Sequence, residues 1–247
     1  GGDDRLFERC GGRATLAIER VGFIDADYTA VGFQAGFNTP PGDGLGDSTR
    51  GIPADAALAL GGVACVDVRA CAFKALGGGG VHAANGTNRF VVAGSTFERL
   101  GQSAVMLTGN ATTQPRFGRV EGNAIARLGL SLSSAAGVYC SSCSDTQIVN
   151  NSVAFAPRWG VHVRSESDGG PSDSSRNLIA RNRLATLGGQ TKDFGAISRI
   201  ADEGAPAANT TIEHNCVRDV LGVYSTSEGY VYDAGYMSYG IYLDNEA

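Results

Sequence analysis

The stretch TQIVNNSVAFAPRWGVHV, residues 146–163, contains a whole structural unit in a short length of chain. An apolar pair precedes Asn150-Asn151, a second apolar segment follows, and a glycine turn leads into Val161-His162-Val163. Strands of four to eight residues separated by Gly, Pro and Asn occur in every class of β protein. The stretch alone therefore predicts short β-strands and leaves their arrangement open.

The same frame recurs along the chain, which decides the arrangement. Related segments are CVDVRACAF (65–73), FVVAGSTF (90–97), FGRVEGNAI (117–125), NLIARNRL (177–184) and TTIEHNCV (210–217). One position of the frame is occupied in turn by Cys71, Ser95, Asn123, Asn151, Asn182 and Asn215, at separations of 24, 28, 28, 31 and 33 residues. After each of them a glycine or alanine opens another strand, in GVHA at 80, AVML at 104, GVYC at 137, GVHV at 160, GAIS at 195 and GIYL at 240. Three short strands per repeat predict an all-β parallel β-helix of about seven stacked coils.

The recurrent asparagine is expected at a tight corner of each coil. Asn tolerates the left-handed αL conformation, and its amide can both donate to and accept from the Asn of the neighbouring coil. We therefore expect a ladder of stacked amides along the solenoid, of the kind that forms in cross-β structures. The alternative is a set of independent turn residues.

Composition fits a single domain over residues 1–247. Gly is 36 of 247 residues while Pro is only 7, so the excess of glycine reflects the demand for turns. Hydrophobic residues make up 43%, enough for a continuous core, and no apolar run reaches the length of a membrane span. The net charge of −5 argues against a nucleic-acid partner, which needs a clustered basic face.

The two ends of the sequence suggest a piece of a longer protein. The chain begins Gly1-Gly2-Asp3-Asp4 and stops at Ala247 just after an expected strand, where another coil would follow. Open strand edges need caps, so we expect truncation at both ends, with caps or further domains outside this sequence. Residues 15–33 are the first recognisable coil, with Gly22 in place of the corner Asn.

Two segments interrupt the coils. The Pro- and Gly-rich residues 37–57 are predicted to form an inserted loop, and the Tyr-rich residues 224–236 a second insertion. No cofactor is expected. Asp43 and Asp47 are the only weak indication of a calcium site, and a solvated turn explains them better.

Cysteines and glycosylation signals point to an extracellular setting. Six cysteines, an even number, suit disulfides without assigning their pairing, whereas the spacing of Cys140 and Cys143 with only three histidines in the chain is a weak zinc signature. N-glycosylation sequons begin at Asn85, Asn110, Asn150 and Asn209. Together they favour a secreted or cell-surface glycoprotein.

Alternation along the third strand of each coil separates core residues from outward ones. We expect the core-facing residues to be Val81, Val105, Val138, Val161 and Ile241. The side chain of the residue that follows each of them then points away from the core. The first outward row is then expected to be His82, Met106, Tyr139, His162, Ile197 and Tyr242, and the second Ala84, Thr108, Ser141, Arg164, Arg199 and Asp244.

These two rows predict a polar groove. Equivalent residues on neighbouring strands of this groove lie about 4.8 Å apart, a spacing suited to an elongated ligand. Tyr139, His162 and Tyr242 offer flat surfaces for the apolar faces of sugar rings. Arg164 and Arg199 suit hydroxyls or carboxylates. The alternative is an ordinary solvated sheet face.

Carboxylates for catalysis are expected in the last coils. Asp193 directly precedes one outward-facing strand and Asp244 ends the equivalent strand of the next coil, so the two converge across neighbouring rungs. Two carboxylates flanking one bond are the minimum for glycoside hydrolysis. Arg199 is expected between them, where it would keep one carboxylate ionised while the other carries a proton.

The segments DFGAIS (193–198), NTTIEHNCVRDV (209–220) and YGIYLDNEA (239–247) resemble the right-handed parallel β-helix proteins related to pectate lyases. They are most similar to glycoside hydrolases such as family 141, over about the last 110 residues. The resemblance implies a right-handed solenoid and a polysaccharide-active enzyme whose two aspartates match Asp193 and Asp244. Asn245 stands where the family pattern has a second Asp, and Ser198-Arg199 stand where an aromatic residue usually follows.

Three functions remain open from sequence. A secreted glycoside hydrolase acting on a polysaccharide is favoured. A non-catalytic structural or adhesive glycoprotein of a fibre or coat, with self-association, is the first alternative. A polysaccharide lyase with Arg164 or Arg199 as base is the second, although lysine is scarce and no calcium-binding cluster is evident.

Overall fold

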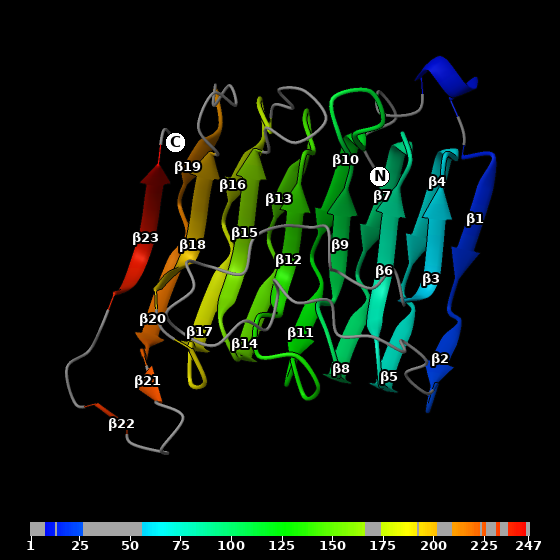
Figure 1. Ribbon diagram of the computed structural model, residues 1–247. Helices are drawn as coiled ribbons and strands as arrows, with labels where there is room; N and C mark the ends of the chain where they lie inside the picture. Colours follow the sequence, from blue (N-terminus) through cyan, green and yellow to red (C-terminus); the bar gives the residue numbers. More distant parts are fainter. Residues whose placement is uncertain are drawn as a thin grey trace.

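The structure is a computed structural model that describes residues 8–12, 14–26, 56–165, 174–191, 193–201, 209–222, 224–225, 231–232 and 237–245. Regular structure in this part of the chain is β-strand, apart from a short 3₁₀ turn at residues 8–10. The strands form three parallel sheets of seven strands each (Figure 1).

Each sheet takes one strand from each coil. Sheet A contains β1 (Leu16–Glu19), β4 (Ala64–Arg69), β7 (Asn88–Ala93), β10 (Arg116–Glu121), β13 (Gln147–Val149), β16 (Leu178–Ala180) and β19 (Thr211–Glu213). Sheet B contains β2 (Gly22–Ile24), β5 (Ala72–Leu76), β8 (Thr96–Leu100), β11 (Ala124–Ala126), β14 (Ser152–Ala156), β17 (Arg183–Leu187) and β20 (Cys216–Val220). Sheet C contains β3 (Ala56–Gly61), β6 (Gly79–Ala84), β9 (Val105–Thr108), β12 (Ala136–Ser141), β15 (Trp159–Ser165), β18 (Phe194–Ala201) and β23 (Ser238–Asn245).

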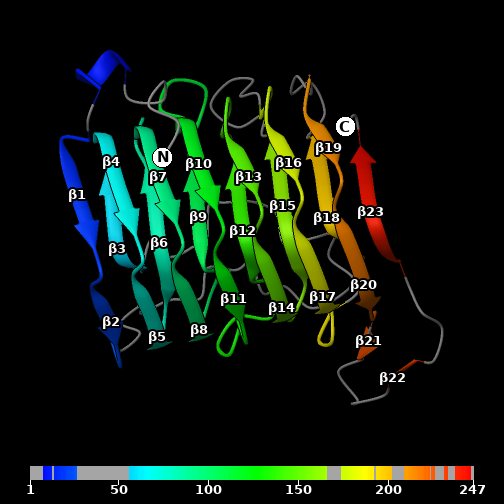
Figure 2. The same ribbon diagram turned by 180° about the vertical axis from the view of Figure 1, so that it is seen from behind.

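This arrangement is a right-handed parallel β-helix of about seven coils, and it confirms the fold predicted from the repeat. Equivalent residues of successive coils pair in parallel, as Ile148 does with Ile179 in sheet A and Val153 with Leu184 in sheet B. Seen from behind, the strands follow one another along the solenoid in sequence order from blue to red (Figure 2).

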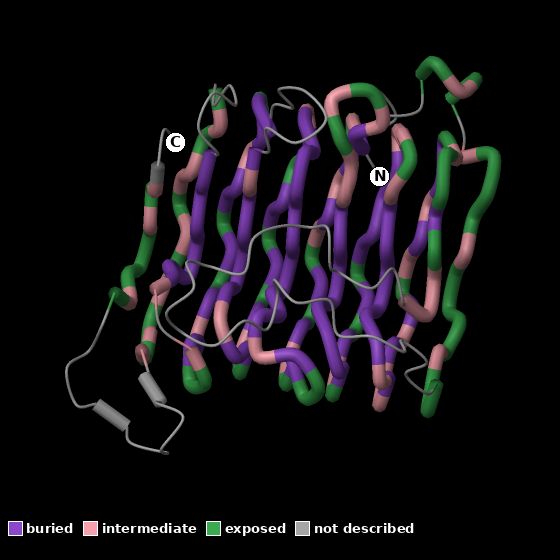
Figure 3. The backbone as a smooth tube through the Cα atoms, viewed as in Figure 1, coloured by how far each residue is buried: buried purple, intermediate pink, exposed green. Residues whose placement is uncertain are grey.

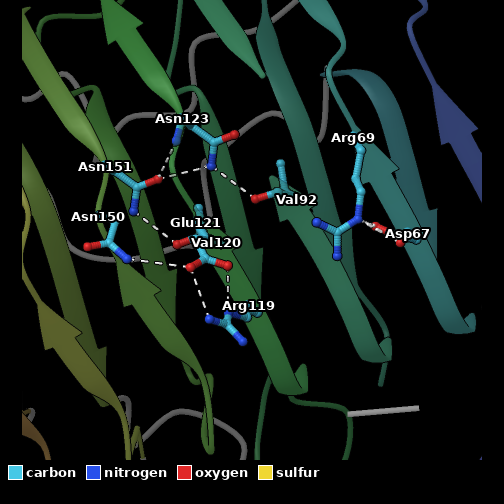
Figure 4. A network of polar contacts seen from close by, with 9 residues as sticks. All are labelled: Asp67, Arg69, Val92, Arg119, Val120, Glu121, Asn123, Asn150 and Asn151. Carbon is cyan, nitrogen blue, oxygen red and sulfur yellow. Dashed lines mark hydrogen bonds and ion pairs between the residues drawn. The ribbon is translucent and has the colours of Figure 1, made fainter. Parts of the chain in front are cut away.

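The predicted asparagine ladder is present and buried. Asn151 accepts hydrogen bonds at Oδ1 from the backbone amide of Asn123 (3.1 Å) and from its side-chain amide (3.0 Å). Asn151 in turn donates to Oδ1 of Asn182 through its backbone and side-chain amides, at 3.0 Å each. It also donates to the carbonyl of Val120 at 2.9 Å (Figure 4). Because the side-chain amides of Asn123, Asn151, Asn182 and Asn215 all have partners, the ladder fixes the coils in register without leaving a buried side-chain amide unsatisfied.

The ladder continues in both directions with the expected residues. Asn182 donates to Asn215, and toward the N-terminus the Ser95 amide donates to Asn123 Oδ1 and the Cys71 amide to Ser95 Oγ. One expectation was wrong. The left-handed conformation belongs to the residue before the ladder residue, as at Asn150 (φ 57°) before Asn151, so the ladder residue itself enters the next strand and turns its side chain inward.

Stacked side chains fill the interior. Phe23, Phe73 and Phe97 occupy one row of sheet B with ring centroids 4.7 Å apart, and Ile125 and Val153 continue the row. The sheet C strands begin with small residues, because side chains from sheet B occupy the space beside the turn that precedes each of these strands. A Cβ on Gly137 would lie 2.7 Å from Val153 Cγ1, so the recurrent glycine is a packing requirement.

Several predicted boundaries differ from the structure. Gly22 pairs with Ala72, so Val21, not Gly22, occupies the corner row of the first coil. Residues 56 and 57 of the predicted loop 37–57 belong to β3, because their alanines pair into sheet C, while residues 37–55 lie outside the described part. Within residues 224–236, β21 (Tyr224–Ser225) pairs antiparallel with β22 (Val231–Tyr232).

The cysteines form two disulfides, Cys10–Cys65 and Cys140–Cys143. Cys71 and Cys216 are free thiols, the first buried in the corner row and the second exposed in β20. An even count therefore indicated disulfides correctly without implying that all six residues are paired.

Burial changes along the solenoid (Figure 3). Core rows are covered in the middle coils but open at both ends of the described chain, where Leu16 is 47% exposed and Ile241 and Leu243 are 51% and 59% exposed. Across the described residues, no helix has the length and apolar character to cross a membrane.

Candidate functional site

The candidate residues lie on the outer face of sheet C. Strand pairing places Tyr139, His162, Ser198 and Tyr242 in one row across β12, β15, β18 and β23. The next outward row contains Ser141, Arg164, Ile200 and Asp244. Most members of both predicted rows are thus where alternation puts them.

Strand β18 is an exception, shifted by one residue from the prediction. Ile197 pairs with Val161 in the inward row, so Ser198 takes the outward place next to His162. The shift has a packing reason. The position at the start of each sheet C strand needs a small residue, and in β18 Ala196 supplies it next to Gly160. The following, core-facing position is then filled by the β-branched Ile197.

Arg199 moves with this shift. It pairs with Val163 and Leu243 in the inward row and is only 4% exposed. Its guanidinium donates to Ser165 Oγ at 2.8 Å and to the Ile200 carbonyl. The predicted position of Arg199, outward between the two aspartates, is therefore wrong.

Asp193 and Asp244 are brought together by one tyrosine. Asp193 immediately precedes β18, Asp244 is in β23, and both are partly exposed. The Tyr242 hydroxyl is within hydrogen-bonding reach of both carboxylates, and partial burial together with these two negative charges raises the pKa of Tyr242. A hydroxyl oxygen within one hydrogen-bond length of both groups limits the nearest carboxylate oxygens to a separation of at most about 6 Å, and its single hydrogen is donated to one carboxylate at a time.

Arg158 supports Asp193 from the preceding coil. Its Nη2 donates a 2.9 Å hydrogen bond to the backbone carbonyl of Asp193, which has the left-handed φ of 57°. Its guanidinium lies 4.1 Å from the Trp159 ring centroid. Burial lowers the pKa of Arg158 to about 10, against the opposing influence of Asp193 and Tyr139, so it stays charged at neutral pH.

An aromatic cluster packs beside this arginine. The rings of Trp159 and His162 stack at 4.1 Å, and those of Tyr139 and His162 at 5.1 Å. Burial lowers the pKa of His162 well below its usual value, and the positive charges of Arg164, Arg158 and Arg199 lower it further. His162 is therefore a neutral imidazole under physiological conditions.

The cluster is less accessible than predicted. Tyr139 and His162 are each 2% exposed, so they do not offer open faces to a sugar. Exposed aromatic surface is found instead at Tyr239, 42% exposed, which stacks on Tyr242 at 4.7 Å beside the aspartates.

Unsatisfied polar atoms mark the same region. Within the described part of the chain, Trp159 Nε1, His162 Nδ1 and Arg158 Nε are buried without a hydrogen-bond partner. Buried polar groups are nearly always paired, so three unpartnered nitrogens, on Trp159 and on the two side chains that pack against its ring, indicate a place where water or a ligand group binds.

Sequence reasoning missed Arg158, Trp159 and Tyr239 as members of this region. The residue types of Arg158 and Trp159 gave no sign that the Arg158 guanidinium reaches the carbonyl of Asp193, 35 residues later. The spacing of three between Trp159 and His162, repeated at Tyr239 and Tyr242, was an available signal.

The four sequon asparagines, Asn85, Asn110, Asn150 and Asn209, are all exposed. For a metal, the described residues contain no group of three or more His, Cys, Asp or Glu side chains that could hold an ion. Asp43 and Asp47 lie outside the described residues.

Comparison with known families adds no relative. No family model matches the chain, and neither does any curated protein. The parallel β-helix architecture therefore rests on the structure itself.

Proposed function

We propose that the protein is a secreted carbohydrate-active β-helix protein that hydrolyses glycosidic bonds of a polysaccharide with Asp193 and Asp244. The observation that carries this proposal is the Tyr242 hydroxyl, which reaches both carboxylates. A separation of at most about 6 Å between the nearest carboxylate oxygens is compatible with the ~5–5.5 Å spacing of the two carboxyl groups in retaining glycosidases and is shorter than the ~6.5–9.5 Å of inverting ones.

In the proposed reaction the two aspartates have different roles. One aspartic acid protonates the leaving glycosidic oxygen, and the other carboxylate acts as nucleophile or activates water. Tyr242 orients the pair through its hydroxyl. Arg158 holds the backbone of Asp193 in place, and the exposed Tyr239 provides a surface on which a sugar ring packs.

The resemblance to glycoside hydrolases such as family 141 is part of this proposal. It is supported by the position of Asp193 before one sheet C strand and of Asp244 near the end of the next, as in the motifs of that family. Two disulfides and four exposed sequons support secretion, because disulfides persist in oxidising compartments.

A panel of plant and algal polysaccharides, incubated with the wild-type protein and analysed for new reducing ends, tests the proposal. Saturated oligosaccharides are expected as products. Unsaturated products would indicate a lyase and contradict hydrolysis, and the absence of any product across the panel would remove the catalytic assignment.

A structural role in an assembly is the second candidate, favoured by one observation. Ile241 and Leu243 continue core rows of sheet C yet are more than half exposed, so another apolar surface would be buried favourably against them. Sedimentation of wild type and of an Ile241→Ser, Leu243→Ser variant tests this role. Concentration-dependent association of the wild type alone supports it, and a wild type that stays monomeric rejects it.

A further inference from the structure

A cavity of about 370 Å³ lies away from the aspartates, where the first residues of β7 and β10 meet the loop that follows β9. Its lining includes Arg9, Asn88, Arg89, Thr112, Arg116 and Phe117. Its described lining therefore contains three arginines and no carboxylate, in a protein whose net charge is −5.

The charge of these arginines is not balanced within the described chain. Some surface arginines pair with acidic neighbours, as Arg69 does with Asp67 at 2.7 Å and Arg119 with Glu121 at 2.8 Å. Among the described residues, no carboxylate forms an ion pair with Arg9, Arg89 or Arg116. Three positive charges around one hollow attract an anion and repel one another while it is empty.

The walls of the cavity are held in place. Asn110 Oδ1 accepts from the amides of Thr112 (2.9 Å) and Thr113 (3.0 Å), and the Gly86 amide donates to the Thr113 carbonyl at 2.6 Å. Arg116 and Asn88 are partners in sheet A. The Cys10–Cys65 disulfide ties the turn that carries Arg9 to β4.

One aromatic ring belongs to the same cavity. Phe117 is 40% exposed, and the Arg89 guanidinium lies 5.1 Å from its centroid. A guanidinium fork binds oxyanions through paired hydrogen bonds, and an exposed ring packs against the apolar face of a sugar.

We propose that this cavity binds an oxyanion carried by a sugar, a carboxylate or a sulfate, with the sugar ring against Phe117. The sugar part rests on the proposed carbohydrate function, whereas the anion part rests on the arginines alone. The cavity would act as an anchoring site for an acidic polysaccharide, separate from the aspartates that cleave it.

Calorimetric titration of the whole protein with D-glucose 6-sulfate, D-glucuronate, inorganic sulfate and D-glucose, at constant ionic strength, tests this site. We expect the two acidic sugars to bind, inorganic sulfate to bind at least several-fold more weakly, and glucose not to bind. Equal affinity for inorganic sulfate and glucose 6-sulfate would overturn the sugar assignment, and no binding of any anion would overturn the site.

Variants locate the binding. Arg89→Gln with Arg116→Gln should weaken glucose 6-sulfate at least ~10-fold, because each substitution removes a charged hydrogen-bond donor. Arg119→Gln is the matched control on β10, since its guanidinium is already paired with Glu121, and it should bind as the wild type does. Loss of affinity in both variants, or in neither, would contradict the assignment.

This test is independent of cleavage. Titration of an Asp193→Asn, Asp244→Asn double variant should give the wild-type affinity for glucose 6-sulfate. If glucose 6-sulfate binds but the wild type cleaves no polysaccharide, the anion site stands and the hydrolase is rejected. If the wild type cleaves a polysaccharide but glucose 6-sulfate does not bind, the hydrolase stands and the anion site is rejected.

Discussion

Arg158 Nη2 donates a 2.9 Å hydrogen bond to the backbone carbonyl of Asp193, which connects the corner of one coil to the first residue of the site in the next. Asp193 has a left-handed φ, a conformation that costs free energy for a residue other than glycine unless its surroundings fix it. The arginine therefore acts as a positioning residue for the carboxylate that follows.

Replacing this arginine should disturb catalysis more than folding. For Arg158→Met we expect kcat to fall roughly 10-fold, because a charged hydrogen bond contributes about 1.5–3 kcal/mol to the placement of Asp193. Kinetics on the cleaved polysaccharide would measure the effect, with Arg176→Met as control, because Arg176 lies just before β16 and is paired with Asp145. Equal kcat values for both variants would contradict the positioning role.

The asparagine ladder makes a prediction about stability. Asn151→Ala removes the acceptor of the Asn123 backbone amide, one of the two acceptors of the Asn123 side-chain amide, and the amide that donates to the Val120 carbonyl. We expect a loss of about 3 kcal/mol, measured as a fall in Tm of roughly 10 °C. Asn150→Gly should cost little, because Asn150 is exposed and has a positive φ that suits glycine.

Serine provides an internal control at the same position. Ser95 already occupies the row and accepts from the Cys71 amide, so Asn151→Ser should lose less stability than Asn151→Ala. Calorimetric unfolding of the three variants side by side would show the order. An Asn151→Ala variant as stable as Asn150→Gly would mean that the ladder adds nothing to the free energy of folding.

Buried His162 predicts a pH dependence of stability. Its pKa is lowered in the folded protein, so the unfolded chain takes up a proton first as the pH falls below about 6.5. Stability from this group is therefore complete above pH 6.5 and declines below it, by up to ~1.4 kcal/mol per pH unit.

Chemical unfolding at pH 5.0 and 7.5 measures this decline. His162→Gln should show a smaller difference between the two pH values than the wild type. His214→Gln is the control, because His214 is exposed in the turn before β20. If the wild type and His162→Gln lose the same stability at pH 5.0, the buried imidazole is not the source.

Tyr242 should affect the rate and not the fold. Tyr242→Phe keeps the ring that stacks on Tyr239 but removes the hydroxyl between the carboxylates. We expect kcat to fall about 10- to 100-fold with Tm unchanged within a few degrees. Activity equal to that of the wild type would show that the shared hydroxyl is unimportant.

The repeat made the fold predictable, because every coil of a solenoid has the same packing requirements at equivalent positions. Asn151, Asn182 and Asn215 appear at matched positions, and their ladder followed from the chemistry of the amide. The register of strand β18 was harder to predict to within one residue. Ala196 and Ile197 both fit the pattern of an opening small residue and an apolar strand, and only packing against the neighbouring coil decides which of them faces the core.

The site was predictable where it depended on strand alternation and hidden where it depended on long side chains. Asp193 and Asp244 were expected to converge across neighbouring coils, and the hydroxyl of Tyr242 lies within reach of both. Arg158 acts on a backbone atom of the next coil, a contact that has no signature in sequence. The burial of Tyr139 and His162 was also hidden, because alternation gives direction and says nothing of what covers a face.

The most direct test of the central claim is the rate of reducing-end release from the polysaccharide that the wild type cleaves. Asp193→Asn and Asp244→Asn are each expected to lower kcat by at least ~10²–10⁴-fold, with Tm unchanged. Asp219→Asn, which alters an exposed carboxylate on β20, should retain the wild-type rate. Turnover by Asp193→Asn or Asp244→Asn at the rate of Asp219→Asn would contradict catalysis by this pair.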